Sequence, residues 1–395
     1  MTRSLRDWGW LLWLTLLPWA PFIIGNGNKL DLWHEQMMWG HAGLIILTFV
    51  GMVHGTRPIP NLPLAVWLGW VSLLTLVIWN QAVPKFDRYS ALYVKSVGHL
   101  MGLGHVLTVG VLWAAFTSQW TKANVSWLWK LLTYAAVVHV AYGVLQLWQW
   151  DQFFHSNDPA VATDTLVGML GNPNHYGAWL VMTLPLFLLQ EKRWWLGMAV
   201  ITIILILMTK SVGAVGAMFA GLLWWTLANP TWKRCSGLAS LLLLTIFLGI
   251  AFADDVTKDS GRIQAYTYYW HIFEQRAITG FGPGMVGEIA KQITNGPMVG
   301  WRHCHQEMLQ MLVEQGIVGG LLVLWLVGET LKRAWQVRRN LLGAACGAGF
   351  VATLANAMVN FPFHLSAVAI PCALMAMTCW ILSETPETGE AEWRH

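Results

Sequence analysis

Apolar runs of about twenty residues, the length that crosses a bilayer as a helix, recur along the chain and restrict its possible folds most. A helix suits this environment because all its backbone polar groups are paired internally. Only 11% of the residues are charged, whereas a soluble protein has about a quarter. We expect an all-α polytopic membrane protein with about twelve transmembrane helices in one integral membrane domain, residues 1–395. The expected spans lie near residues 8–24, 37–54, 63–80, 97–117, 127–148, 173–190, 194–209, 211–228, 236–253, 304–331, 341–361 and 365–383.

The positive charges of the short loops predict the orientation of the chain. With the N-terminus in the cytoplasm, most Lys and Arg residues of these loops fall on the cytoplasmic side. The loop 149–172 contains three aspartates and no Lys or Arg, so it belongs on the outer side. We expect both termini in the cytoplasm and the long polar loop 254–303 outside. No small-residue cleavage site follows residues 8–24, which indicates a retained span rather than a signal peptide.

Several functional classes do not fit this composition. A net charge of +4 without a basic run is too small to indicate a nucleic-acid partner. Five scattered cysteines do not form a disulfide framework. The segment His303-Cys304-His305 has no second ligand cluster at a suitable spacing, so we expect no metal ion and no cofactor.

The most polar helix start of the chain lies at residues 302–319, after the long loop. Histidines, carboxylates and an arginine are costly to desolvate at a membrane border, which suggests a functional role. His305 would lie close to Arg302 at the mouth of the helix. In a regular helix, four further polar side chains would share one face: His303, Glu307, Gln310 and Glu314.

Three other polar segments are expected on the same outer side of the membrane. Asn172 and Pro173 are typical of a helix start, and they place Asn174 and His175 in its first turn. Lys210 lies in a very short turn between two apolar runs, where it either snorkels to the interface or meets an anionic ligand. The long loop carries Arg262 before an amphipathic segment and a Gly-rich turn at 280–284.

Cations and helix N-termini gathered on one side of a membrane favour a phosphate-rich ligand. Arginine grips phosphate with two parallel hydrogen bonds, and a neutral histidine at a helix start can act as a base. These groups suit transfer from a phosphate leaving group to a hydroxyl. A transporter with a polar stripe lining its path is an alternative, although no inverted repeat supports it. A second alternative gives the stripe only a helix-packing role.

The order of these motifs resembles the O-antigen ligase/Wzy-type polymerase superfamily of bacterial membrane glycosyltransferases. The similarity covers residues 165–325 and includes Gly171-Asn-Pro-Asn, the Thr-x-Ser turn at 209–211, Arg262, the Gly-x-Gly-x-Gly loop and His303-x-His305-Gln306, continuing to Glu314-x-Gly-x-x-Gly. The resemblance implies a glycosyltransferase C-like fold in the bacterial inner membrane. It also implies metal-independent, inverting transfer of an undecaprenyl-pyrophosphate-linked glycan at the periplasmic face.

The resemblance further implies a role for each site residue. His305 would be the catalytic base and His303 a supporting catalytic residue. Arg262 and Arg302 would hold the pyrophosphate. The other candidates for substrate binding are Lys210, Gln306, Asn174, His175 and Glu314.

Two positions depart from the pattern of the superfamily. Gln306 stands where the superfamily usually has asparagine, and Val212 replaces the arginine of the Thr-x-Ser-Arg turn, with Lys210 as a possible substitute charge. The acceptor stays open between lipid A–core, a growing glycan and a protein serine, so ligase, polymerase and protein O-oligosaccharyltransferase activities all remain.

Overall fold

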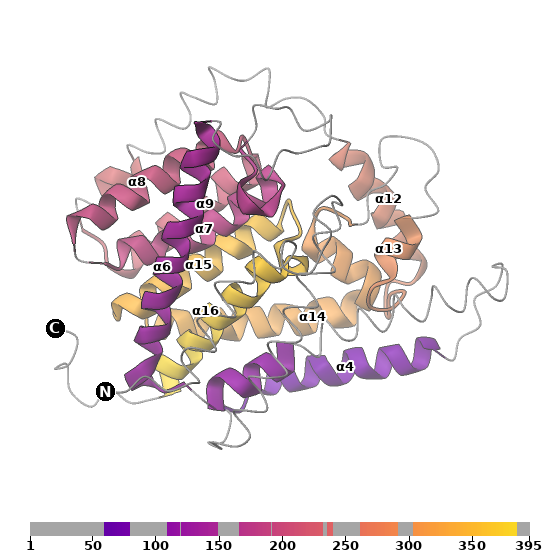
Figure 1. The fold of residues 1–395 in the computed structure, drawn as a ribbon. Coiled ribbons are helices and arrows are strands. Elements are labelled where there is room, and N and C mark those ends of the chain that lie inside the picture. Colours follow the sequence, from indigo (N-terminus) through magenta and orange to yellow (C-terminus); the bar gives the residue numbers. More distant parts are fainter. Residues whose placement is uncertain are drawn as a thin grey trace, which may run out of the picture.

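The computed structural model describes residues 59–79, 109–118, 120–148, 166–190, 192–231, 235–239, 261–290 and 303–384, and every regular element in these ranges is helical (Figure 1). The predicted spans at 8–24 and 37–54 lie outside these residues, as do most of 97–117 and 236–253. The described helices are α4 (Leu62–Trp79), α6 (Lys122–Leu147), α7 (Pro173–Leu188), α8 (Arg193–Met208), α9 (Val212–Ala228), α12 (Arg262–Gln275), α13 (Met285–Ala290), α14 (Glu307–Gln336), α15 (Leu341–Ala357) and α16 (Ser366–Glu384). Two short 3-10 helices are present as well, η2 (Gly168–Leu170) and η3 (Pro362–His364). Further helical residues lie at Val109–Ser118 and at 235–239.

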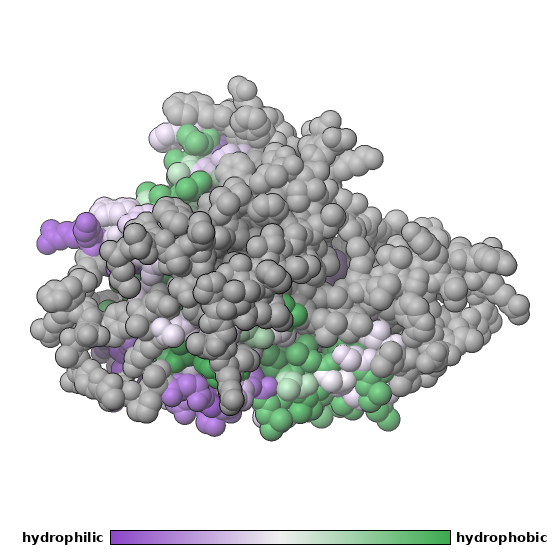
Figure 2. Space-filling view, turned by 60° about the horizontal axis from the view of Figure 1, so that its bottom comes forward, coloured by the Kyte–Doolittle hydropathy of each residue, from purple (hydrophilic) through white to green (hydrophobic). Residues whose placement is uncertain are grey.

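Three described helical segments are long and apolar enough to cross a membrane: Val125–Leu147, Glu307–Gln336 and Ala367–Glu384. The shorter apolar helices include α8, α9 and α15, which coincide with predicted spans. The helical membrane class is therefore supported, whereas the expected number of twelve spans is not confirmed. Figure 2 shows hydrophobic residues gathered in a larger group along the lower edge of the view and in a smaller one at its upper left.

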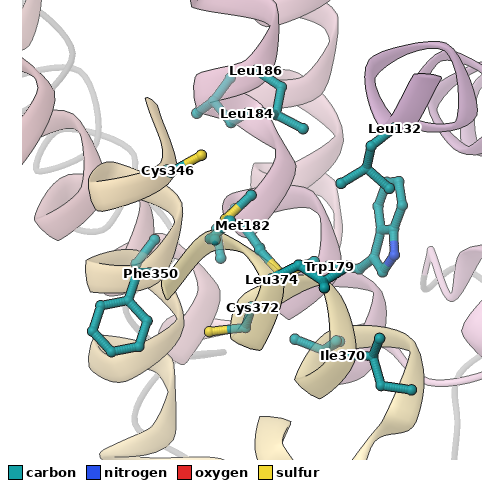
Figure 3. Close-up of a cluster of buried hydrophobic side chains, with 14 of the residues drawn as sticks. Leu132, Trp179, Met182, Leu184, Leu186, Cys346, Phe350, Ile370, Cys372 and Leu374 are labelled. Atoms are coloured by element: carbon teal, nitrogen blue, oxygen red, sulfur yellow. The ribbon is translucent and has the colours of Figure 1, made fainter. Parts of the chain in front are cut away.

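The core of the bundle is built around α7, whose residues from Tyr176 to Phe187 are all buried. A helix that is apolar on every side can only be accommodated among other helices. Figure 3 shows its side chains Trp179, Met182, Leu184 and Leu186 among residues of α6, α15 and α16. The start of α7, which carries Asn174 and His175, is thereby held in a fixed position.

Small residues of α15 allow its neighbours to approach closely, as is common where membrane helices pack. A Cβ atom on Gly221 of α9 would lie 3.0 Å from the Cβ of Ala352 and 3.1 Å from the carbonyl oxygen of Ala348. A Cβ on Gly349 would lie 2.6 Å from the carbonyl oxygen of Met182 in α7 and would overlap the sulfur of Met375. The close packing of α7, α9 and α15 therefore depends on glycine, which has no side chain, at positions 221 and 349.

We expect Gly349→Ala to destabilise the protein by about 1–3 kcal/mol, because the added methyl overpacks a contact with backbone. The thermal midpoint of the purified protein in detergent would fall. Gly216→Ala in α9 is the matched control, since nothing lies within 4 Å of a Cβ there. That control should be neutral or slightly stabilising. Equal midpoints for the two variants would contradict the close packing.

A break in α14 divides the site-bearing end of this helix from its remainder. Gly316 has φ 69° and ψ −173°, which no helical residue adopts. Gln315, just before the break, accepts a hydrogen bond from Trp67 Nε1 at 2.8 Å through its side chain and one from Trp70 Nε1 at 3.3 Å through its backbone oxygen. These bonds fix the break against α4, which runs alongside α14 in Figure 1.

Candidate active site

The start of α14 differs from the regular helix predicted over 304–331. The helix begins at Glu307, because the side chain of Gln306 accepts a hydrogen bond from the backbone N–H of Leu309 and caps it. His303 therefore precedes the helix and is not part of a regular polar face. Its Nδ1 nevertheless lies 3.2 Å from Oε1 of Gln310, since the chain folds back over the first turn.

His305 has a strained backbone conformation. Its φ of 55° is in the left-handed region, where residues other than glycine are uncommon. Lys210 has a φ of 54°, and these are the two described non-glycine residues with positive φ. The hydroxyl of Tyr266 in α12 donates to the backbone oxygen of His305 at 3.1 Å and supports this conformation. Backbone strain that the surroundings maintain, as at His305, is typical of functional sites.

Phe361 brings three histidines from distant parts of the sequence together. Its ring centroid lies 5.3 Å from that of His175, 4.7 Å from that of His303 and 4.8 Å from that of His305. The His303 ring is stacked on Phe361, whereas the other two rings meet it edge-on. The predicted residues His175, His303 and His305 therefore belong to one cluster, around an aromatic residue that the sequence analysis did not single out.

The structure adds His364 to this cluster, and sequence reasoning missed it. It lies in η3, between α15 and α16, and its ring centroid is 5.0 Å from that of His303. Its Nδ1 lies 2.9 Å from Oε2 of Glu307, and the other oxygen of Glu307 accepts from the backbone N–H of Phe363 at 2.8 Å. Both carboxylate oxygens thus tie η3 to α14. The signal available in the sequence was Pro362-Phe363-His364, which interrupts an apolar stretch.

The charge states of the histidines follow from burial and neighbours. Burial, and after it the positive charge of Arg262, lowers the pKa of His305 to about 4. Burial also holds the pKa of His303 well below its ordinary value, with His364 as the next cause. Burial would lower the pKa of His364, but the carboxylates of Glu307 and Glu314 raise it above its ordinary value. His303 and His305 are therefore neutral near pH 7, and a neutral imidazole carries its lone pair on one ring nitrogen.

The Gly-rich turn lies against the break in α14. The carbonyl oxygens of Val313 and Glu314 accept from the backbone N–H groups of Phe281 and Gly282, both at 2.8 Å. The buried side chain of Glu314 accepts from the backbone N–H of Val286 at 3.3 Å. Glu314 was predicted to bind substrate, and in the structure it holds this turn, which fixes where α12 and α13 lie relative to the histidines.

The remaining predicted residues lie near the cluster or outside the described chain. Asn174 Oδ1 accepts from Ser211 Oγ at 2.7 Å, which joins the start of α7 to the turn that carries Lys210. Gly213, after that turn, packs against Asn360, the residue before Phe361. Lys210 itself is exposed. Arg262 starts α12 and acts electrostatically on His305, whereas Arg302 lies outside the described residues.

Within the described ranges, no three His, Cys, Asp or Glu residues are grouped so that they could hold a metal ion. The cluster instead combines neutral imidazoles with Arg262 and the start of α7. Such a combination can accept a proton from a hydroxyl and stabilise a developing negative charge.

Fold and site together define a helical membrane protein with a histidine cluster where several helices begin. Residues 197–324, from α8 to just beyond the break in α14, match the family described as O-antigen ligase (Wzy_C). This match, within a helical membrane protein, confirms the resemblance to the O-antigen ligase/Wzy superfamily over these residues. The family suggests a glycosyltransferase-like enzyme acting on a lipid-linked glycan and an acceptor. A search of curated proteins gave no match.

Proposed function

We propose that this protein transfers an undecaprenyl-pyrophosphate-linked glycan to an acceptor hydroxyl at the periplasmic face of a bacterial inner membrane, as an O-antigen ligase does. Lipid A–core or a related surface glycan would be the acceptor. The observation that carries this proposal is a pair of neutral histidines, His303 and His305, with Arg262 close enough to lower the pKa of His305. A base beside a cation is what transfer from a phosphate leaving group needs.

In the proposed mechanism, His305 takes the proton from the acceptor hydroxyl while its oxygen attacks the anomeric carbon. The bond from this carbon to the pyrophosphate oxygen breaks, and attack from the opposite side inverts the configuration. Arg262 stabilises the charge that develops on the leaving pyrophosphate, with Arg302 and Lys210 assigned to the same group. No step in this scheme uses a metal ion. His303 supports His305, and Asn174 and His175 shape the acceptor side.

The low pKa of His305 matters for this role. A base must be unprotonated at the working pH, and a group with a pKa of about 4 is almost entirely neutral at pH 7. The cost is weak basicity, so the proton moves only as the attacking oxygen loses electron density in the transition state. Arg262 therefore has two effects: it stabilises the leaving group and keeps His305 neutral.

We expect the purified full-length chain in liposomes to transfer a glycan from undecaprenyl pyrophosphate to lipid A–core, seen as a mobility shift on a gel. Parallel reactions would offer a glycan still attached to undecaprenyl pyrophosphate, or a serine-containing peptide, as acceptor. If only the glycan attached to undecaprenyl pyrophosphate accepts the transferred glycan, the protein is a polymerase and not a ligase. Solute uptake by the liposomes, without product from any acceptor, would refute the proposal and indicate a transporter.

A further inference from the structure

Gln310 lies between His303 and His364, and its amide contacts four polar groups. Its Oε1 is 3.3 Å from the backbone nitrogen of Cys304 and 3.2 Å from Nδ1 of His303. Its Nε2 is 3.5 Å from Oε1 of Glu314 and 2.9 Å from Nε2 of His364. Gln310 is buried, with 3% of its surface exposed, so these neighbours determine how its amide is oriented.

Two of the neighbours have fixed hydrogen-bonding roles and set the amide orientation. A backbone N–H can only donate, so the side facing Cys304 must be the amide oxygen. Oε1 of Glu314 accepts from the backbone N–H of Val286, so it is an acceptor and the side of the amide facing it is the NH2 group. Because the two requirements agree, the orientation follows from chemistry even though oxygen and nitrogen of an amide look alike.

This orientation determines where the protons lie on both histidines. His303 faces an oxygen with Nδ1, so Nδ1 carries the proton and the lone pair lies on Nε2. The Nε2 atom of His364 faces the NH2 group of Gln310, so this ring nitrogen carries the lone pair. The proton of neutral His364 then lies on Nδ1, toward Glu307. A second proton on His364 would point at the NH2 group. The amide would then have to turn over, giving up its bonds to Cys304 and Glu314, and it would present a donor to His303.

We propose that Gln310 is a positioning residue that sets the tautomer of His303, with the proton on Nδ1 and the lone pair on Nε2, and that it does so only while His364 is neutral. The charged and titratable groups around the pair are Glu307 and Glu314 of α14, His175 of α7, His305 before α14, and Arg262 of α12, which acts through His305. The two carboxylates draw a proton to His364, whereas Gln310 opposes it, so the tautomer of His303 responds to pH. The catalytic consequence rests on the proposed function.

The tautomers can be measured without any substrate, by nitrogen-15 NMR of the full-length chain labelled at histidine and held in lipid nanodiscs. The His303 signal is assigned by its loss in His303→Asn. We expect the Nδ1–H form in mildly alkaline buffer, converting to the Nε2–H form in step with the double protonation of His364 as the pH falls. In Gln310→Met, His303 should lose its Nδ1–H form and no longer follow His364.

The matched control is Gln315→Met, which removes another buried glutamine amide from α14, bonded to Trp67 instead of the histidines. It should leave the His303 tautomer unchanged.

In transfer assays Gln310→Met should lower kcat by about tenfold or more with little change in KM, because a histidine in the wrong tautomer fails in the chemical step. Either of two results would overturn the proposal that Gln310 sets the tautomer of His303. They are an Nε2–H form of His303 in the wild type in alkaline buffer, and an unchanged Nδ1–H form in Gln310→Met. A normal spectrum with no transfer to any acceptor would instead count against the proposed function alone.

Discussion

His305→Asn should reduce glycan transfer by at least about 10²-fold while the protein stays folded, because it removes the proposed base. Asparagine is chosen because its short polar side chain tolerates the left-handed backbone that His305 adopts. Alanine has no polar side chain to ease this backbone conformation, so it would confuse loss of chemistry with loss of structure. Initial rates of transfer in liposomes, with the thermal midpoint measured alongside, separate the two effects.

The matched control is His271→Asn in α12. His271 is 69% exposed and paired with Glu274, so it does not belong to the histidine cluster. It should keep both the rate and the midpoint of the wild type. Full transfer activity in His305→Asn would refute the mechanism with His305 as base, whatever acceptor the protein uses.

Gly316→Ala should disrupt both the stability and the activity of the protein. The φ and ψ of Gly316 lie in a region that is essentially restricted to glycine, which costs another residue about 1–3 kcal/mol. The added methyl would also overlap the backbone carbonyl of Ile278. The segment before the Gly-rich turn would therefore be pushed away from α14. The 2.8 Å hydrogen bond that the N–H of Ile317 donates to the carbonyl oxygen of Ala277 would be lost.

The thermal midpoint in detergent and the transfer rate both report on this change. Gly328→Ala in the same helix is the control, because nothing lies within 4 Å of a Cβ at that position. It should leave the rate unchanged and raise the midpoint slightly, since alanine favours a helix. A Gly316→Ala protein as stable and active as this control would show that the break in α14 is not required.

Much of the fold was predictable, because apolar runs alone select membrane helices. Local chemistry also gave the starts of helices: Asn172 caps α7 through a 2.9 Å bond from the N–H of Asn174, as expected from Asn-Pro. The break at Gly316 was not predicted. Apolar residues continue past it with helical spacing, and its cause is tertiary: the Gly-rich turn replaces the hydrogen bonds that the helix gives up.

The site was partly predictable for a similar reason. His303, His305 and His175 are unusual at helix starts in a membrane protein, so their types and positions indicated function. Which residues meet them depends on how the helices pack, and Phe361 and His364 come from a link between two later helices. Gln310 was noted only as one residue of a polar stripe, because its contacts depend on the chain folding back before α14.

The contacts of Glu307 also limit which segments of this protein can be exchanged with a related protein. The Glu307 carboxylate joins the stretch that matches the family to η3, which lies beyond that stretch. In a chimera that exchanged only residues 197–324, the residue at position 307 would come from the other protein, whereas η3 would remain from this one. A transplant of this site would therefore have to include residues 361–364. The stretch that matches the family, residues 197–324, contains only part of the histidine cluster.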